Sequence, residues 1–563
     1  MISKTCSLPE PVALDQLNWL PMRRADRNWK VEERLAPADD LSQCLQKVDE
    51  CFKKEGFLSY FGPWQGRIPQ ALQRRWHSHA STSVPYHEYI SAFRTSDYSE
   101  SAFIPDDKCK KFAWIMDRCT YLTLLSSFVF AAATWSTTML SVAEANSWVA
   151  GMLCRVLGKK LAKKLGVEPG SFVLPYSYGT LKSKCWTDTG MKFCRKRGHS
   201  CIRKIVSYFG WKKRNLWRSM HRAWDSILKH FGESCDTWSL SDASQRLRCM
   251  SSLPTVCPQG NNFCSRCFRA MADLEGCTGD AGQFFEMVQA NTAVAEAEEL
   301  LKLFTTSGCN VVTVKHPSRK RQAWFGSKGN KFSQKTAVWS VQELFRAFLG
   351  AMLVCLTSVG DRVFCLQCLP IGGLLSKTGA CIVLGGQERR WKQSPQCQVE
   401  EGFRSHVPWE KAVLHFRYID DIVLISRIYC SRCLRFAVAK MYSVPFDCSS
   451  PGERILCWLD MKIFLDSGEL GLFFKPLFPS PPWHSNVLYL RNLFLGRFHR
   501  WTEIAPVQLE WQRAVISLLL DVQKSGWQFS KVLFVLHSIH SCSYKDFVFF
   551  AIHAWKCMKK VPQ

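Results

Sequence analysis

Two adjacent aspartates, Asp420 and Asp421, lie between strongly apolar stretches of this sequence. The segment from His415 to Ser426 reads His-Phe-Arg-Tyr-Ile-Asp-Asp-Ile-Val-Leu-Ile-Ser. Apolar runs on both sides of a short turn are typical of a β-hairpin, with the acids at its tip. Adjacent carboxylates repel each other and are costly to desolvate, and divalent cations reverse that balance. The pair therefore predicts metal-dependent chemistry, with an ordinary surface turn as the simpler alternative.

The charge balance favours a nucleic-acid partner. Lys and Arg total 74 against 47 acidic residues, which gives a formal net charge of +27. Such an excess attracts polyanions over long range. A solvated basic surface or an anionic membrane would explain the same excess. The hydrophobic content of 47% excludes a mostly disordered chain.

The sequence predicts an intracellular protein, nuclear or cytoplasmic and not secreted. The first residues, Met1 to Lys4, lead into Pro9 and Glu10 and not into the apolar run of a secretory signal. The longest apolar stretch, Leu122 to Trp135, is too short to span a bilayer, so we expect a buried helix there and no membrane partner.

The 27 cysteines have no regular spacing, and without export we expect them to be reduced and mostly buried. Three C-x-x-C pairs occur among them, namely Cys264/Cys267, Cys365/Cys368 and Cys430/Cys433. Two such pairs can form a zinc site, but these pairs are far apart in the sequence. Whether any of them binds zinc stays open at this point.

A two-metal site needs a further carboxylate from a neighbouring strand. Asp280 lies just before a long helical pattern that runs through Ala293 to Phe304, and aromatic residues follow it. We favour Asp280 over the competing Asp273 for these reasons. A helix N-cap is the simpler alternative for Asp280, because aspartate also favours that position.

Two further segments flank the acids. Gln367 begins a loop that contains Gly372 and Gly373, which permit close backbone approach to a ligand, although a plain turn would also explain them. Downstream, the segment from Leu456 to Lys475 is predicted to form a hairpin around a turn at Asp466-Ser467-Gly468.

Taken in order, these segments resemble the palm of reverse transcriptases, most closely the Penelope-like retroelement branch, which is related to telomerase. Arg417 to Asp421 is similar to the family's RY-x-DD motif. Gly372 and Ser376, followed by Glu388, resemble its MGSxxS…E segment. Asp280 stands where the first catalytic aspartate is expected, and its separation from Gly372 predicts an insertion.

The resemblance extends to both sides of the acids. Leu459-Asp460 and Lys475-Pro476 resemble the family's FLD…Y-x-K-P hairpin. Tyr178 to Lys184 and Ile202 to Ser207 resemble its fingers pattern Y-x-x-P-K-x-H-K…R-P-I-V-S, although Leu181, Ser183 and Lys204 depart from it.

The resemblance implies an α+β right-hand polymerase with fingers, a palm built on an antiparallel sheet, and a helical thumb. Residues 1–95 would form an N-terminal extension of unknown role, 96–250 a basic fingers-like region, 251–480 the palm with an insertion, and 481–563 a helical thumb-like region.

The resemblance also implies an RNA-directed DNA polymerase that uses two magnesium ions, for which manganese can substitute. Asp280, Asp420 and Asp421 would be the catalytic metal ligands. The partners would be an RNA template, a DNA or RNA primer and deoxynucleoside triphosphates, and no protein partner is evident. The nucleotide-binding residues would be Lys184, Arg203, Phe285, Gln367, Gly372 and Lys475, with Phe285 beneath the incoming sugar.

Two basic clusters are further candidates for contact with nucleic acid. Lys192 to Trp224 interleaves Lys and Arg with aromatic residues, which can either stack on bases or belong to a core. Lys315 with Arg319, Lys320 and Arg321 can track a duplex or form a plain basic loop.

Two other functions also fit the sequence, namely an RNA-directed RNA polymerase and a catalytically silent nucleic-acid-binding derivative of a retroelement.

Overall fold

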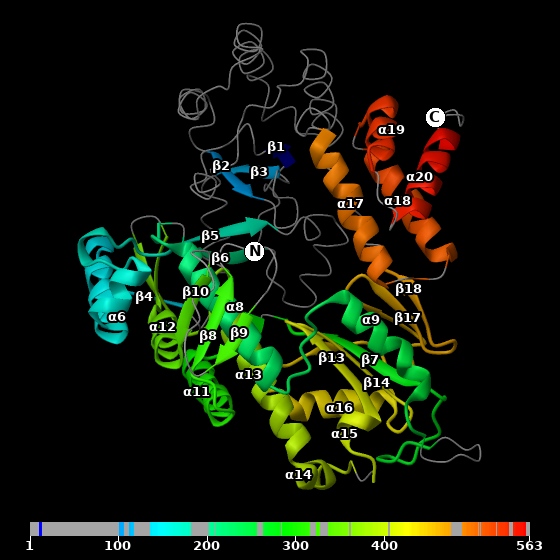
Figure 1. The fold of residues 1–563 in the computed structure, drawn as a ribbon, viewed down its shortest axis with the longest axis horizontal. Helices are drawn as coiled ribbons and strands as arrows, with labels where there is room; N and C mark the ends of the chain where they lie inside the picture. Colours follow the sequence, from blue (N-terminus) through cyan, green and yellow to red (C-terminus); the bar gives the residue numbers. More distant parts are fainter. Residues whose placement is uncertain are drawn as a thin grey trace, which may run out of the picture.

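The computed structural model has a mixed α/β fold (Figure 1). It describes residues 135–558 and, before them, the sheet of β1 (Pro11–Ala13), β3 (Phe112–Asp117) and β2 (Ser101–Pro105). The description of 135–558 has gaps at 182–201, 209, 256–262, 283, 316–322, 327–335, 360–361, 404–405, 474–486, 505, 507, 525 and 540–543.

A four-stranded antiparallel sheet carries the adjacent aspartates. Its strand order is β13 (Val413–Tyr418), β14 (Asp421–Ser426), β7 (Glu275–Asp280) and β15 (Asp447–Cys448). β13 and β14 are antiparallel neighbours, with Tyr418 opposite Asp421. Ile419 and Asp420 form the turn between them, so the predicted hairpin is confirmed.

Both faces of this sheet are buried in apolar cores. Side chains alternate between the faces along a strand, so Val423 and Ile425 pack into one core while Ile422 and Leu424 pack into the other. Helices on opposite sides contribute to these cores (Figure 1). The helical segments around the sheet are α9 (Leu240–Arg248), η6 (Cys249–Ser252), α13 (Ser376–Gln393), α14 (Pro395–Glu400), α15 (Trp409–Ala412) and α16 (Ser431–Met441).

A second sheet has five strands in the order β4 (Trp135–Thr137), β12 (Arg362–Leu366), β11 (Leu356–Val359), β5 (Tyr176–Leu181) and β6 (Ile202–Ser207). Only the β11–β5 contact is parallel. The sheet takes strands from both the 96–250 and the 251–480 regions. Beside it lie α6 (Val142–Leu165) and the short helix η4 (Pro169–Ser171).

The chain between Asp280 and Gly372 builds a further layer. It contains α10 (Phe284–Met287), α11 (Ala290–Thr306), α12 (Val341–Leu353) and the sheet β10 (Thr336–Ser340), β8 (Val311–Lys315) and β9 (Ala323–Gly326), besides β11 and β12. Helix α8 (Arg214–Phe231) packs on this sheet. Capping begins α12, because the Ser340 hydroxyl accepts the Glu343 N–H and the Glu343 carboxylate accepts the Ser340 N–H.

The C-terminal part combines a hairpin sheet with helices. The strands are β16 (Ile455–Trp458), β17 (Met461–Phe464) and β18 (Glu469–Leu472), and the helices are α17 (Val487–Ile504), α18 (Gln508–Lys524), α19 (Phe529–His537) and α20 (Lys545–Met558). The predicted turn at Asp466 to Gly468 is confirmed. Asp460, in the turn before β17, accepts a 2.6 Å ion-pair contact from Arg500 of α17.

The aromatic residues of the basic 192–224 segment that the structure describes belong to the core. Trp217 and Trp224 are fully buried, and Tyr208 and Trp211 are 7% exposed. The Trp224 ring lies 5.0 Å from that of Phe348 in α12. A base-stacking role for these four rings is therefore wrong. Trp217 and Trp224 pack into the core from α8, and Tyr208 and Trp211 do so from the segment before it.

Several sequence expectations lie outside the described residues. These are the role of 1–95 apart from β1, the helix expected over Leu122 to Trp135 apart from its last residue, the basic residues 192–197, the cluster 319–321, and Lys184 and Lys475. Trp135 begins strand β4, so the expected helix does not extend to it. Within the described ranges, no helix is both long and apolar enough to cross a membrane.

We predict that Gly372→Ala destabilises the protein by about 1–3 kcal/mol. Gly372 has φ +95°, and an added Cβ would lie 2.5 Å from the carbonyl oxygen of Val206 in β6. That backbone cannot retreat easily, because the Val206 N–H donates to the Ile371 carbonyl at 2.8 Å. Thermal unfolding followed by circular dichroism measures the effect.

Gly151→Ala is the matched control. Gly151 lies inside α6 with no atom within 4 Å of an added Cβ, so alanine there should be neutral or slightly stabilising. Equal melting temperatures for the two variants would contradict the close approach of the Gly372 loop to β6.

Candidate active site

Three acids face one another across neighbouring strands. Asp421 of β14 lies directly opposite Asp280 of β7, and Asp447 of β15 lies opposite Asp280 on its other side. Direct cross-strand partners point to the same face, with Cβ atoms about 5 Å apart. The sheet therefore presents a row of three carboxylates on the adjoining strands β14, β7 and β15.

Asp420 joins this row from the hairpin turn. The backbone N–H of Ala281, which follows Asp280, donates to the Asp420 carbonyl at 2.9 Å. Ile419, the other turn residue, has φ +60°. A β-branched residue rarely adopts this left-handed conformation, and such strain persists only where the surroundings enforce it. The turn is thus held in a conformation that its sequence does not prefer.

The two-residue loop between β13 and β14 itself requires a positive φ at its first residue. The buried guanidinium of Arg417, at the end of β13, supports this conformation. Its Nη1 donates to the carbonyl of the strained Ile419 at 3.2 Å. The other guanidinium nitrogens pair with the carboxylates of Glu388 in α13 and, at 3.0 Å, of Asp236. Arg417 and Glu388 are fully buried and Asp236 nearly so. The turn that carries Asp420 therefore rests on an ion network within the core.

Hydrogen bonds complete the environment of Glu388. Tyr442 donates its hydroxyl to Glu388 at 2.7 Å and lies 2.9 Å from Nε2 of His415, whereas the Cys235 N–H donates to Glu388 at 2.6 Å. Burial alone would raise the pKa of Glu388, but Arg417 holds it below its ordinary value. Burial lowers the pKa of His415 to about 3, so its ring is neutral.

Burial raises the pKa of the Asp236 carboxyl to about 6, although Arg417 opposes this shift. Near pH 7 the network therefore holds one cation and two carboxylates, with Glu388 the more firmly ionised. The sequence resemblance places Glu388 in a family motif but assigns it no role. In this structure Glu388 pairs with Arg417.

The competing acid, Asp273, lies away from this row. It precedes the start of β7, whereas Asp280 ends that strand. Its carboxylate pairs with Arg427, which follows β14, at 3.0 Å. Asp273 and Asp280 are therefore at opposite ends of the same strand, and only Asp280 lies beside the hairpin tip.

The short helix α10 follows Asp280 and carries Phe285. The Phe285 ring is half-buried and lies 5.1 Å from that of Phe284 in an edge-to-face arrangement. Its neighbour Glu286 pairs at 3.0 Å with the buried Lys204 of β6. This ion pair ties α10 to the five-stranded sheet and so fixes the element on which Phe285 sits.

The other described candidates lie on the elements that surround α10. Arg203 is half-buried in β6 opposite Thr180, and Gln367 is exposed just after β12. Gly372 lies in the loop before α13, against the backbone of β6. The backbone freedom of this glycine allows its close approach to β6, and its predicted contact with a ligand stays a prediction.

Asp447 was not identified from the sequence. It lies in a two-residue strand. Apolar residues alternate through Val444, Phe446 and Cys448, which favours an extended segment but does not show which strand it pairs with. Only the pairing of β15 with β7 brings it next to Asp280.

The donor set fits magnesium in kind, because all four side chains of the row offer the carboxylate oxygens that hard cations prefer. In placement, Asp280, Asp420 and Asp421 come from adjoining strand ends. Their oxygens do not gather within 4.8 Å of one another, whereas two other groups in the described residues do so, namely the four cysteines of two C-x-x-C pairs and the trio Cys235, Glu388 and His415.

No protein-family model matches the chain, and no curated protein matches it. Among solved structures, a telomerase from Candida albicans in complex with a TWJ fragment of telomeric RNA is similar over 99% of this chain and 78% of its own, with 9% identity and a TM-score of 0.49. The apo telomerase of Candida tropicalis matches over 97% and 84%, with 12% identity and a TM-score of 0.45.

We predict that Arg417→Ala destabilises the protein by about 3–5 kcal/mol, because it leaves Glu388 and Asp236 buried without their cation. Chemical denaturation monitored by tryptophan fluorescence measures this loss.

Arg513→Ala is the matched control. Arg513 also pairs with a carboxylate, Glu510, at 3.2 Å, but its side chain is 66% exposed. Its loss should cost less than about 1 kcal/mol. Similar costs for the two arginines would mean that the Arg417 network does not support the fold.

Proposed function

We propose that this chain is an RNA-directed DNA polymerase that extends a primer 3′ end by two-metal nucleotidyl transfer. The observation that carries the proposal is the direct pairing of Asp280 with Asp421, beside the turn that bears Asp420. Acids on adjoining strand ends, supported by a buried ion network, are suited to holding divalent cations at fixed positions.

The proposed enzyme has a right-hand architecture. The four-stranded sheet with its acids would be the palm, the five-stranded sheet the fingers, and α17 to α20 the thumb. The sequence motifs favour an origin in the Penelope-like branch of retroelements. The net charge of +27 suits an RNA template paired with a DNA or RNA primer. The proposed location is the nucleus or the cytoplasm.

The proposed roles of individual residues follow from the sequence resemblance and, where the structure describes the residue, agree with its position. Magnesium ions, when bound, would activate the primer hydroxyl and neutralise the triphosphate. Asp280, Asp420 and Asp421 would hold those ions. Arg203 would contact the phosphates of the incoming nucleotide, and Gln367 the template or nascent pair. Lys184 and Lys475 keep their proposed nucleotide contacts from the sequence resemblance.

Arg417 would act indirectly, as a positioning residue. Its hydrogen bond to the Ile419 carbonyl fixes the turn, and the turn fixes Asp420. Asp447, beside Asp280, adds negative charge to the same end of the sheet. We propose that it supports the metal-binding acids by raising the local affinity for cations.

We expect Asp420→Ala to abolish primer extension while template binding stays nearly unchanged, because this carboxylate acts on charge in the transition state. Extension of a labelled primer on RNA and DNA templates measures synthesis, and fluorescence anisotropy measures binding. Normal extension by this variant would refute the site.

The two competing acids give an internal comparison. Asp280→Asn should reduce extension far more than Asp273→Asn, because only Asp280 lies opposite Asp421. The same assay with ribonucleotides and deoxynucleotides separates the alternative functions. Preferred use of ribonucleotides would indicate an RNA polymerase, and RNA binding without any synthesis would indicate a silent derivative.

We predict that Phe285→Val admits ribonucleotides and retains some deoxynucleotide incorporation. A bulky ring beneath the incoming sugar would collide with a 2′-hydroxyl. Phe285 lies on α10, the short helix after Asp280, and its side chain is half-buried. The ratio of ribonucleotide to deoxynucleotide incorporation is the measurement, with the melting temperature recorded alongside.

Phe284→Val is the matched control. Phe284 is 3% exposed, so its truncation should destabilise the protein and leave sugar preference alone. If Phe285→Val behaves in the same way as this control, Phe285 is a core residue and not a sugar gate.

A further inference from the structure

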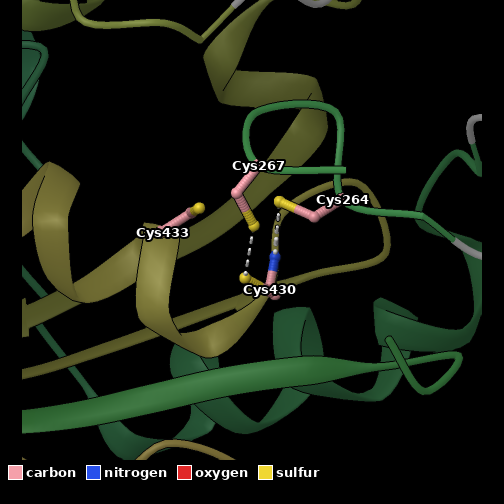
Figure 2. A group of neighbouring side chains, drawn as sticks. All are labelled: Cys264, Cys267, Cys430 and Cys433. Carbon is pink, nitrogen blue, oxygen red and sulfur yellow. Dashed lines mark hydrogen bonds between the residues drawn. The ribbon is translucent and has the colours of Figure 1, made fainter. Parts of the chain in front are cut away.

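Two of the three C-x-x-C pairs meet in space. Cys264 and Cys267 lie in the loop before β7, and Cys430 and Cys433 lie at the start of α16, after β14 (Figure 2). Both pairs have the same sequence, Cys-Ser-Arg-Cys. The four Sγ atoms all lie within 4.8 Å of one another, although 163 residues separate Cys267 from Cys430.

The spacing of the sulfurs suits a single tetrahedral ion. Zinc–sulfur bonds of about 2.3 Å in a tetrahedron place the sulfurs about 3.8 Å apart. The Sγ atoms of Cys267 and Cys430 are 3.6 Å apart. A disulfide would require about 2 Å. Four sulfurs that face a common centre are therefore arranged for a metal and not for cross-links.

The surroundings of the cluster supply donors to the sulfurs. The backbone N–H of Cys430 donates to Sγ of Cys264 at 3.4 Å, and Nη1 of Arg266 donates to Sγ of Cys433 at 3.8 Å. Four thiolates around a divalent ion carry a net negative charge, which N–H donors and a guanidinium offset. Arg266 is itself held in place, because it stacks 3.8 Å from the Phe436 ring and donates to the Glu401 carbonyl at 2.9 Å.

We propose that Cys264, Cys267, Cys430 and Cys433 bind one structural zinc ion. Four protein ligands leave no open position for a substrate, so the ion would have no catalytic role. The pairs flank the ends of β7 and β14 remote from the acids, where Ser426 lies opposite Glu275. Backbone contacts reinforce this clamp, since Ser265 donates to the Ile428 carbonyl at 3.0 Å. The zinc ion would fix the register that places Asp421 opposite Asp280.

The test is the metal content of the full-length protein, purified under reducing conditions, dialysed and analysed by plasma mass spectrometry. We expect one zinc ion per chain. The double variant Cys264→Ser/Cys433→Ser, which removes one ligand from each pair, should lose the ion and melt at a lower temperature. The control Cys365→Ala/Cys368→Ala removes the third C-x-x-C pair and should retain the zinc.

A measurement on the unmodified protein covers the case in which the cysteine variants fail to fold. An organomercurial in excess over all 27 cysteines should release one zinc ion per chain from the native protein, measured with a chromogenic zinc chelator. Replacement of zinc by cobalt should give the absorption bands of tetrahedral thiolate coordination.

Three results would overturn the proposal: a zinc content far below one ion per chain, iron with the visible absorption of an iron–sulfur cluster, or disulfides between these cysteines under native conditions. None of these outcomes depends on polymerase activity, so the proposed function and the zinc site are tested separately.

Discussion

The buried guanidinium of Arg417 is the interaction on which the acidic hairpin depends. It neutralises Glu388 from α13 and Asp236 from the segment between α8 and α9, and it also holds the Ile419 carbonyl. Removing three charges from water is expensive and is tolerated only when each is paired and hydrogen-bonded. Such a network has few alternative arrangements. It therefore fixes the position of a strained turn more strictly than apolar packing would, and a site that must hold metal ions at set distances gains from that strictness.

Ion pairs and a close backbone contact link the five-stranded sheet and the β16–β18 sheet to the helices and loops beside them. Lys204 of β6 pairs with Glu286 of α10, and the Gly372 loop contacts the Val206 backbone, so the elements around α10 are anchored to the five-stranded sheet. On the other side, Arg500 of α17 pairs with Asp460 beside β17. These contacts join the elements that follow Asp280 to the five-stranded sheet, and α17 to the β16–β18 sheet.

The sequence predicts the features of this site that have a local pattern. Apolar flanks around Asp420 and Asp421 predict the hairpin, and the strand-to-helix transition after Asp280 favours that acid over Asp273. Features that depend on distant pairing leave no such pattern. The alternation around Asp447 does not show that its strand pairs with β7, and Glu388 reads as an ordinary helix residue. The two Cys-Ser-Arg-Cys segments look unrelated until β7 and β14 pair. The aromatics of α8 show the reverse problem, because a basic segment with tryptophans looks the same whether its rings face solvent or the core.

The pairing of β7 with β14 has a consequence for how the protein folds. The two strands are about 140 residues apart in the sequence, and α11, α12 and the β8–β10 sheet lie between them. Pairing these strands closes a long loop of the chain, which costs conformational entropy. Contacts between distant segments therefore form more slowly than local contacts do. During synthesis, β7 emerges long before its partner and must wait with an open edge, while the intervening elements can already fold. The acidic row is thus assembled late, and a chain that stops short of β14 would contain Asp280 without ever forming the site.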